Sequence, residues 1–256
     1  MGILDVFKDA FRRQVKLAGE KALEEREIDE IIKSANNLFI TEEGERNLLT
    51  SEINLTHRLF KSAAEAFNIN RNDPDAKLLL NISLYLRSHT IDKLNALKNT
   101  RRDLAAIVAE AEEGEKNDKI IRAITLSEDP QYRRIKLKEK LHDLDTVVSA
   151  MHDIKDKAED IKRSLNIIEK NTENMLLIIE GGSQEPGFRN VQPLLRLLEF
   201  LKSADVKRFI ITKRIVKKLQ EVLAKEFESI HLLRRKIKAV EFRGEKVLRL
   251  VKKYAA

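Results

Sequence analysis

The sequence contains no cysteine and no tryptophan, and only 8 of its 256 residues are glycine and 4 are proline. Without cysteine the chain cannot form disulfides or bind a metal through thiolates, so we expect a reducing, cytoplasmic compartment. Helix-breaking residues are rare, charged residues make up 36% and aromatic residues only 5%, and this composition favours helices over sheets.

Long apolar runs are also absent. The longest, residues 78–86, is interrupted by Asn81 and Ser83 and is about half as long as the roughly 20 residues that cross a bilayer. The first residues lack the basic and apolar regions of a signal peptide, and Val6 stands where the myristoylation signal requires Ser or Thr. We therefore expect no transmembrane span, no signal peptide and no lipid anchor.

The short motifs that mark common catalytic sites are missing as well. The sequence has no Gly-x-Ser-x-Gly nucleophile motif, no Walker-type Gly-Lys-Ser/Thr loop and no Gly-x-Gly-x-x-Gly dinucleotide fingerprint. These absences predict a non-enzymatic protein with no cofactor and no small-molecule substrate.

The strongest candidate for a metal or catalytic site is a pair of Glu-x-x-His motifs, Glu139–His142 and Glu228–His231. Such motifs on two helices help to bind di-iron centres in helical bundles, together with a glutamate from each of two further helices. Neither histidine lies on the apolar stripe of its helix, so we predict no metal site and keep a di-metal carboxylate enzyme as a distant alternative.

Apolar residues recur three or four positions apart along the chain, which is the spacing of one helical face. This spacing predicts a helix to about Phe39, a break over Asn36–Gly44 and a second helix from Thr41 to Asn68. Asp73 and Pro74 are a strong helix start, and the helix that they begin is expected to end at Gly114. A short helix is expected over residues 118–126.

The most regular segment follows, with a near-heptad stripe of apolar residues from Leu137 to Ile179. We predict that it packs antiparallel against the helix begun by Asp73. The predicted fold is therefore all-α, a long antiparallel coiled-coil-like helical hairpin or bundle with additional flanking helices. The Gly- and Pro-rich residues 181–187 predict a loop, a short helix is expected over residues 191–202, and Asp205 can cap a final long helix.

These signals suggest four regions. The predicted boundaries are 1–72 for the N-terminal amphipathic helices, 73–180 for the long helical hairpin, 181–189 for a loop or hinge, and 190–256 for a basic C-terminal helical region.

Basic residues are concentrated at the C-terminal end. The chain has a formal net charge of +7, but residues 187–256 hold 19 basic and 7 acidic residues, a net +12, whereas residues 1–186 are net −5. Such a concentration attracts phosphate-rich surfaces, and no motif for reading bases accompanies it. The predicted anionic-surface or nucleic-acid binding residues are Lys207, Arg208, Lys213, Arg214, Lys217, Lys218, Arg234, Arg235, Lys236 and Lys238. A solvated face, or docking onto an acidic protein surface, is the alternative.

The first residues predict a membrane contact in which Phe7 and Phe11 insert and the basic C-terminal helix steers the approach, because an apolar helix face lies opposite a basic one. The residues expected to bind the membrane are Ile3, Leu4, Phe7 and Phe11, with Lys8, Arg12 and Arg13. With Met1-Gly2-Ile3 and Phe7 in similar places, the first dozen residues resemble the N-terminal amphipathic helix of the phage-shock and ESCRT-III-like membrane-remodelling proteins. That resemblance implies binding to a membrane surface. The chain departs from that family in its acid-rich residues 20–52 and in the break at residues 72–74, and an ordinary core-facing helix is the alternative.

Together these observations predict a helical scaffold or interaction protein that self-associates, binds a helical partner or docks peripherally on an anionic membrane. The alternative is a sequence-independent nucleic-acid-binding protein that acts through the basic C-terminal helix.

Overall fold

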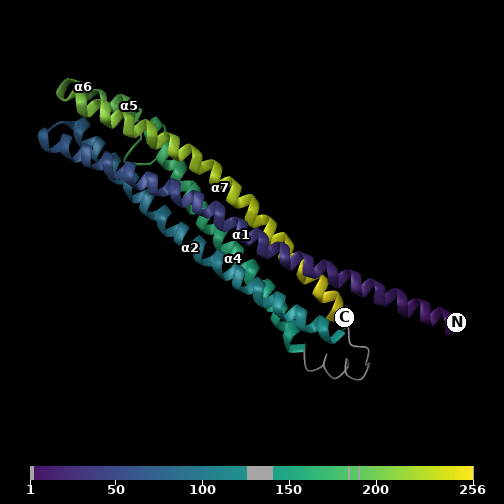
Figure 1. Cartoon of the computed structure of the whole chain (residues 1–256). Coiled ribbons are helices and arrows are strands. Elements are labelled where there is room, and N and C mark those ends of the chain that lie inside the picture. Colours follow the sequence, from purple (N-terminus) through teal and green to yellow (C-terminus); the bar gives the residue numbers. More distant parts are fainter. Residues whose placement is uncertain (1–2, 126–140, 184, 190, 256) are drawn as a thin grey trace. The chain divides into compact units, whose positions relative to one another are not determined.

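The computed structural model describes residues 3–125, 141–183, 185–189 and 191–255, with side chains described for 26–116, 145–183, 185–189 and 191–251 and for Gly19 and Leu23. These residues form helices and no strand, which confirms the predicted all-α fold (Figure 1). The helices are α1 (Ile3–Ile69), α2 (Pro74–Thr125), α4 (Leu141–Glu180), α5 (Leu194–Leu197), α6 (Glu199–Ala204) and α7 (Val206–Ala255). None of the helices in this part of the chain is apolar enough over a sufficient length to cross a membrane.

Helix α1 runs without interruption from Ile3 to Ile69, so the predicted break over Asn36–Gly44 is wrong. A buried face formed by Leu38, Glu42, Glu45 and Leu49 continues through this segment at helical spacing. A single glycine inside a helix costs only about 1 kcal/mol relative to alanine. The packing of this face therefore outweighs the local preference of Gly44.

Helix α2 begins as predicted but ends later than predicted. The Asp73 carboxylate accepts hydrogen bonds from the backbone N–H groups of Asp75 and Ala76, at 2.9 and 3.3 Å. The helix continues past Gly114 to Thr125, so the predicted end and the separate short helix after it are wrong. Gly114 is buried, and a Cβ atom there would lie 3.3 Å from Met151 Cε. The glycine thus allows α2 and α4 to approach closely and does not end the helix.

Helix α4 confirms the apolar stripe of the near-heptad segment. Every stripe position from residue 151 onward is buried, namely Met151, Ile154, Ala158, Ile161, Leu165, Ile168, Thr172 and Met175. The first residues of the predicted segment, 137–140, lie outside the described residues. After α4, Gly181 adopts a φ of 84°, which favours glycine, and the predicted loop follows. The short helix predicted next is divided into α5 and α6.

The chain forms two compact units, and each long helix contributes a part to both. Unit 1 contains Met1–Phe39, Arg102–Ile161 and Arg235–Ala256, and unit 2 contains Ile40–Arg101 and Lys162–Arg234. In unit 1, the Glu27 carboxylate of α1 pairs with Arg243 and Lys246 of α7, at 3.1 and 2.6 Å.

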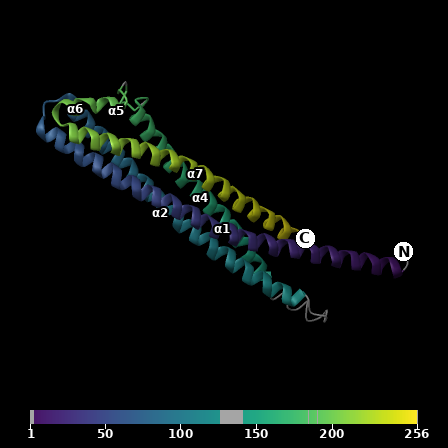
Figure 2. The same cartoon turned by 45° about the horizontal axis from the view of Figure 1, so that its top comes forward.

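Unit 2 holds the residues from which a functional site can be argued. Its neighbouring helices are antiparallel, because Glu42 of α1 meets Arg101 of α2 whereas Glu52, ten residues later, meets Thr90. Helices α4 and α7 are also antiparallel, because Thr172 contacts Glu226 whereas Glu169, earlier in α4, contacts Arg234, later in α7. Buried aliphatic residues from α1, α2, α4 and α7 form its core, together with leucines of α5 and α6. The two short helices lie near the α1–α2 turn (Figures 1 and 2).

Candidate functional site

The first half of α7 exposes apolar side chains on the face opposite its core contacts. Successive residues turn by about 100° around a helix, which places Val206 and Ile210 nearly opposite the buried Leu219. Val206, Ile210 and Ile211 are 57%, 44% and 42% exposed. Val206 is therefore not part of the core of unit 2. Exposed aliphatic residues at one place on a helix mark a surface that could be covered by a partner.

Basic side chains surround these apolar residues. Lys207, Lys213, Arg214, Lys217 and Lys218 are exposed, and none forms an ion pair with another described residue. One of them, Lys213, places its Nζ atom 5.4 Å from the centre of the Phe209 ring. We define the basic–apolar face as Val206, Lys207, Ile210, Ile211, Lys213, Arg214, Lys217 and Lys218.

The other predicted basic residues of α7 are not part of this face. Arg234 is engaged inside unit 2, where it pairs with Glu169 and donates a hydrogen bond to Asn166. Arg235, Lys236 and Lys238 belong to unit 1, and Lys236 donates to the Asn37 carbonyl at 3.3 Å. The structure thus divides the ten basic residues predicted from the sequence into separate groups.

Beside the basic–apolar face, residues of α1 and α7 line an open surface pocket of about 430 Å³ within unit 2. We call it the basic pocket, and its lining residues are Arg58, Lys61, Ser62, Glu65, Asp205, Lys207, Arg208, Ile211 and Ile215. Arg58 and Lys61 are exposed on α1 and have no ion-pair partner among the described residues. Sequence analysis did not single out these two residues, because they lie about 150 residues from the α7 cations in an acidic half of the chain.

Polar contacts hold the walls of the basic pocket in place. The hydroxyl groups of Ser62 and Thr212 are hydrogen-bonded across the two helices at 2.6 Å. The Arg208 guanidinium pairs with Glu65 at 3.3 Å and with Asp205 at 3.7 Å. Asp205 also caps α7 as predicted, since it accepts a hydrogen bond from the Arg208 backbone N–H at 2.9 Å. Arg208 is therefore fixed, and four basic side chains face only two acidic ones.

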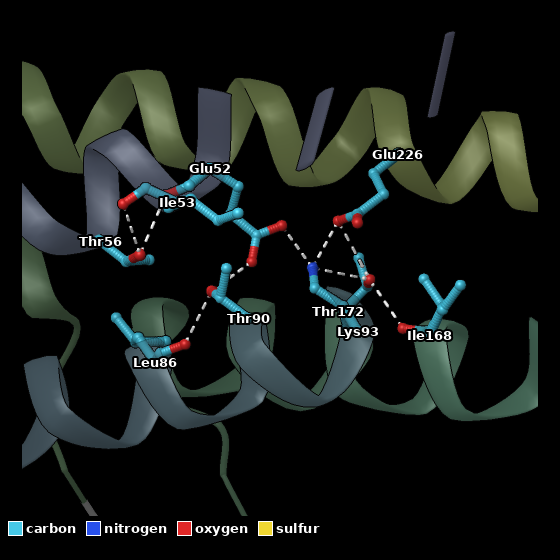
Figure 3. Close-up of polar contacts among 9 residues, drawn as sticks. All are labelled: Glu52, Ile53, Thr56, Leu86, Thr90, Lys93, Ile168, Thr172 and Glu226. Atoms are coloured by element: carbon cyan, nitrogen blue, oxygen red, sulfur yellow. Dashed lines mark hydrogen bonds and ion pairs between the residues drawn. The ribbon is translucent and has the colours of Figure 1, made fainter. Parts of the chain in front are cut away.

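A second set of charges lies in the core of unit 2 (Figure 3). The Lys93 ammonium of α2 lies between the carboxylates of Glu52 on α1 and Glu226 on α7, with Nζ–O distances of 2.5 and 2.6 Å. All three side chains are 0% exposed. The Thr172 hydroxyl of α4 lies 3.2 Å from Glu226 and 3.3 Å from Lys93 Nζ. Each long helix thus contributes to one buried polar layer.

Glu45 adds a third carboxyl group to this layer. It is 1% exposed, and neither of its oxygens nor Glu226 Oε1 accepts a hydrogen bond from a described residue. Burial raises the pKa of Glu45 to about 7 and that of Glu52 to about 8, although the Lys93 charge opposes both shifts. A protonated Glu45 can donate to Glu226, which would satisfy Glu226 Oε1 and one of the two Glu45 oxygens. The layer therefore favours a form in which Glu45 carries a proton.

The buried layer lies inside the helix packing of unit 2 and does not offer a docking surface, because its polar groups face one another and are closed to solvent. Sequence reasoning missed Glu45, Glu52, Lys93 and Glu226. A charged residue in a helical pattern normally marks the solvent-exposed face, and the only signal against that reading is its position in line with buried residues of the same helix.

A second cleft in unit 2, of about 540 Å³, lies between α2 and α4. Its lining residues are His89, Asp92, Asn95, Ala96, Asn99, Ile167, Lys170, Asn171, Asn174 and Glu185. Burial lowers the pKa of His89, so the cleft holds one lysine against two carboxylates. It is therefore a less suitable place for an anion than the basic pocket.

Two further predictions concern residues whose side chains are only partly described. The N-terminal membrane-binding residues Ile3, Leu4, Phe7, Lys8, Phe11, Arg12 and Arg13 lie in α1, but their side chains are outside the described set. Glu139 and the side chain of His142 are also outside it, whereas Glu228 and His231 are exposed. Among the residues with described side chains, no group of three carboxylates or histidines is placed to hold a metal ion.

Comparison with known proteins adds no functional assignment. No protein-family model matches the chain, and no curated protein is significantly similar to it.

Proposed function

We propose that this chain is a non-enzymatic helical protein that docks on anionic membrane surfaces through the basic–apolar face of α7. The observation that carries the proposal is the mixture of residues on that face. Ile210 and Ile211 are exposed between cations that have no ion-pair partner among the described residues. A membrane interface accepts both kinds of side chain, since anionic headgroups attract lysine and arginine while the acyl boundary accepts aliphatic groups.

Docking begins with electrostatic attraction and is completed by insertion of the apolar side chains. Each lysine or arginine near an anionic leaflet contributes about 1 kcal/mol, so the cations of this face can hold the helix at the surface. Ile210 and Ile211 then enter the boundary between headgroups and acyl chains. The predicted N-terminal segment, with Phe7 and Phe11, would supply a second insertion point.

The exposed isoleucines favour a membrane over the alternative partner, a nucleic acid. The lysines and arginines could bind the phosphate groups of a nucleic acid as well as those of a lipid. Proteins that bind single strands, however, also use aromatic residues that stack on the bases. The basic–apolar face contains aliphatic residues and no aromatic residue. Replacing Ile210 and Ile211 should therefore weaken membrane binding and leave nucleic-acid binding unchanged.

Flotation with vesicles of phosphatidylcholine and phosphatidylserine tests the proposal. We expect the protein to float with these vesicles but not with pure phosphatidylcholine, and Ile210→Ser with Ile211→Ser should reduce binding about tenfold. The matched control is Ile91→Ser with Ile167→Ser, which removes two isoleucines that are also exposed in unit 2.

Absence of binding to anionic vesicles would refute the proposal. So would equal binding by the two double variants, because the isoleucines of α7 would then have no special role. Phe7→Glu and Phe11→Glu test the N-terminal segment separately.

A further inference from the structure

We infer that the basic pocket binds the phosphorylated polyol headgroup of a membrane lipid, and this inference rests on the proposed membrane docking. The pocket lies directly beside the face that would contact the membrane, because Lys207 and Ile211 belong to both. A lipid whose headgroup enters the pocket can therefore keep its acyl chains in the membrane that Ile210 and Ile211 contact.

The charge in the pocket fits a phosphomonoester better than a phosphodiester. Arg58 and Lys61 from α1 and Lys207 from α7 line it, and none of them has an ion-pair partner among the described residues. A phosphomonoester carries about 1.5 to 2 negative charges at neutral pH and three acceptor oxygens. The phosphodiester of an ordinary phospholipid carries a single charge. Three uncompensated cations from two helices therefore match the more highly charged group.

One cation is already fixed for recognition. Arg208 is held by Glu65 and Asp205, so little of its side-chain freedom would be lost when an anion binds. A guanidinium has five N–H donors in a rigid plane, and bidentate contact with phosphate is a common use of arginine. The Ser62 hydroxyl, in contact with Thr212, adds a neutral polar group suited to a sugar or polyol hydroxyl.

The size of the pocket indicates more than a bare phosphate. Its volume of about 430 Å³ lies within the range of sites for small organic ligands, which is about 300 to 1,000 Å³. Ile211 and Ile215 supply an apolar wall that could contact the ring carbons of a polyol. These features together point to a phosphorylated inositol headgroup as the kind of ligand that the pocket would accept.

Vesicle binding with two lipids of matched surface charge tests this inference. One set of vesicles contains phosphatidylinositol phosphate, and the other contains phosphatidylserine in the amount that gives the same charge. We expect the wild-type protein to bind the first set about tenfold more tightly. Arg58→Gln with Lys61→Gln should remove most of this preference, because two cations of the pocket are lost.

The matched control is Arg214→Gln with Lys218→Gln, which removes one arginine and one lysine from the part of the basic–apolar face that does not line the pocket. This variant should bind both sets of vesicles more weakly and keep the preference between them. Soluble inositol phosphate in excess should reduce wild-type binding to the phosphatidylserine level. All four positions are on the surface, so urea unfolding should confirm that both variants remain as stable as the wild type.

The outcomes separate this inference from the proposed function. Equal wild-type binding to the two vesicle sets, or a preference that survives Arg58→Gln with Lys61→Gln, would overturn the headgroup site while membrane docking stands. Failure to bind either set would overturn both. A preference for vesicles of phosphatidic acid equal to that for phosphatidylinositol phosphate would also count against a polyol headgroup.

Discussion

Within unit 2, helix α7 carries two opposite arrangements of charge. On its core side Glu226 shares the Lys93 ammonium with Glu52, and no solvent reaches the three groups. On its outer side Lys217 and Lys218 have no ion-pair partner in the described part of the chain. A buried charge persists only with a compensating partner, whereas water solvates a surface lysine at little cost. The buried groups thus compensate one another inside the helix packing, whereas the outer cations are exposed to solvent.

The largest effect is expected when the buried pairing is broken. Lys93→Met should lower the free energy of unfolding by about 3 to 5 kcal/mol, because two buried carboxyl groups lose their cation. Urea unfolding followed by circular dichroism measures this change. Lys98→Met, at an exposed position of the same helix, should change stability by about 0.5 kcal/mol or less.

A rescue variant shows whether the loss comes from unpaired charge or from poor packing. Adding Glu52→Gln and Glu226→Gln to Lys93→Met replaces all three charged residues of the cluster with neutral ones. Part of the lost stability should therefore return. A further decrease in the triple variant would mean that the layer is held by shape and hydrogen bonds, and our view of its charges would be wrong.

The buried layer should also make stability depend on pH. The pKa of Glu45 is raised from 4.5 to about 7, so near neutral pH the folded chain keeps a proton that the unfolded chain has released. Its stabilising contribution is complete below the ordinary pKa and is lost as pH rises through the folded value. The free energy of unfolding should fall by about 1.4 kcal/mol per pH unit for one such group. Glu52, with a pKa of about 8, extends the effect upward.

Urea unfolding at several pH values from about 5 to about 8 measures this dependence. Glu45→Gln should make the decline shallower, because an amide keeps a hydrogen-bond donor towards Glu226 but does not titrate. Glu221→Gln is the control at an exposed position of α7 and should retain the wild-type slope. If Glu45→Gln follows the same curve as the control, Glu45 does not hold the proton.

Asp205 affects both stability and surface charge, because it caps α7 and also neutralises part of the basic pocket. Asp205→Ala should lower the free energy of unfolding by about 1 kcal/mol through loss of the cap. It should at the same time strengthen binding to anionic vesicles, since Arg208 loses one of its two carboxylate partners. Asp73→Ala removes the equivalent cap of α2 and should reduce stability without improving binding. Equal binding by both variants would separate Asp205 from the docking surface.

Much of the fold follows from local rules that the sequence displays directly. The caps Asp73 and Asp205 and the α4 stripe were predictable because side-chain spacing and capping depend on residues only a few positions apart. The predictions that helices would end near Gly44 and at Gly114 were wrong, because the outcome depends on residues far away in the sequence. Whether a glycine ends a helix depends on the neighbouring helix, as the close approach of Met151 to Gly114 shows.

The sites depend still more on contacts between distant parts of the sequence. Glu52, Lys93 and Glu226 come from three helices, and each read alone resembles a surface residue. The α7 cations of the basic pocket were predicted from charge density, but Arg58 and Lys61 were not, since an acidic segment hides them. Charge along the sequence thus identifies a basic helix but not the second wall of a pocket.

The smallest effect on stability is expected where charge is unpaired. Lys217→Gln with Lys218→Gln should change the free energy of unfolding by about 0.5 kcal/mol or less, because water solvates both ammonium groups in the folded and unfolded chain. The same variant should weaken binding to phosphatidylserine vesicles and make it less sensitive to salt, because fewer cations contact the anionic surface. Lys98→Gln with Lys170→Gln removes the same charge from the α2 and α4 side of unit 2 and should leave binding nearly unchanged. Equal weakening by both variants would mean that net charge alone attracts the protein, and that the arrangement of cations on α7 has no role.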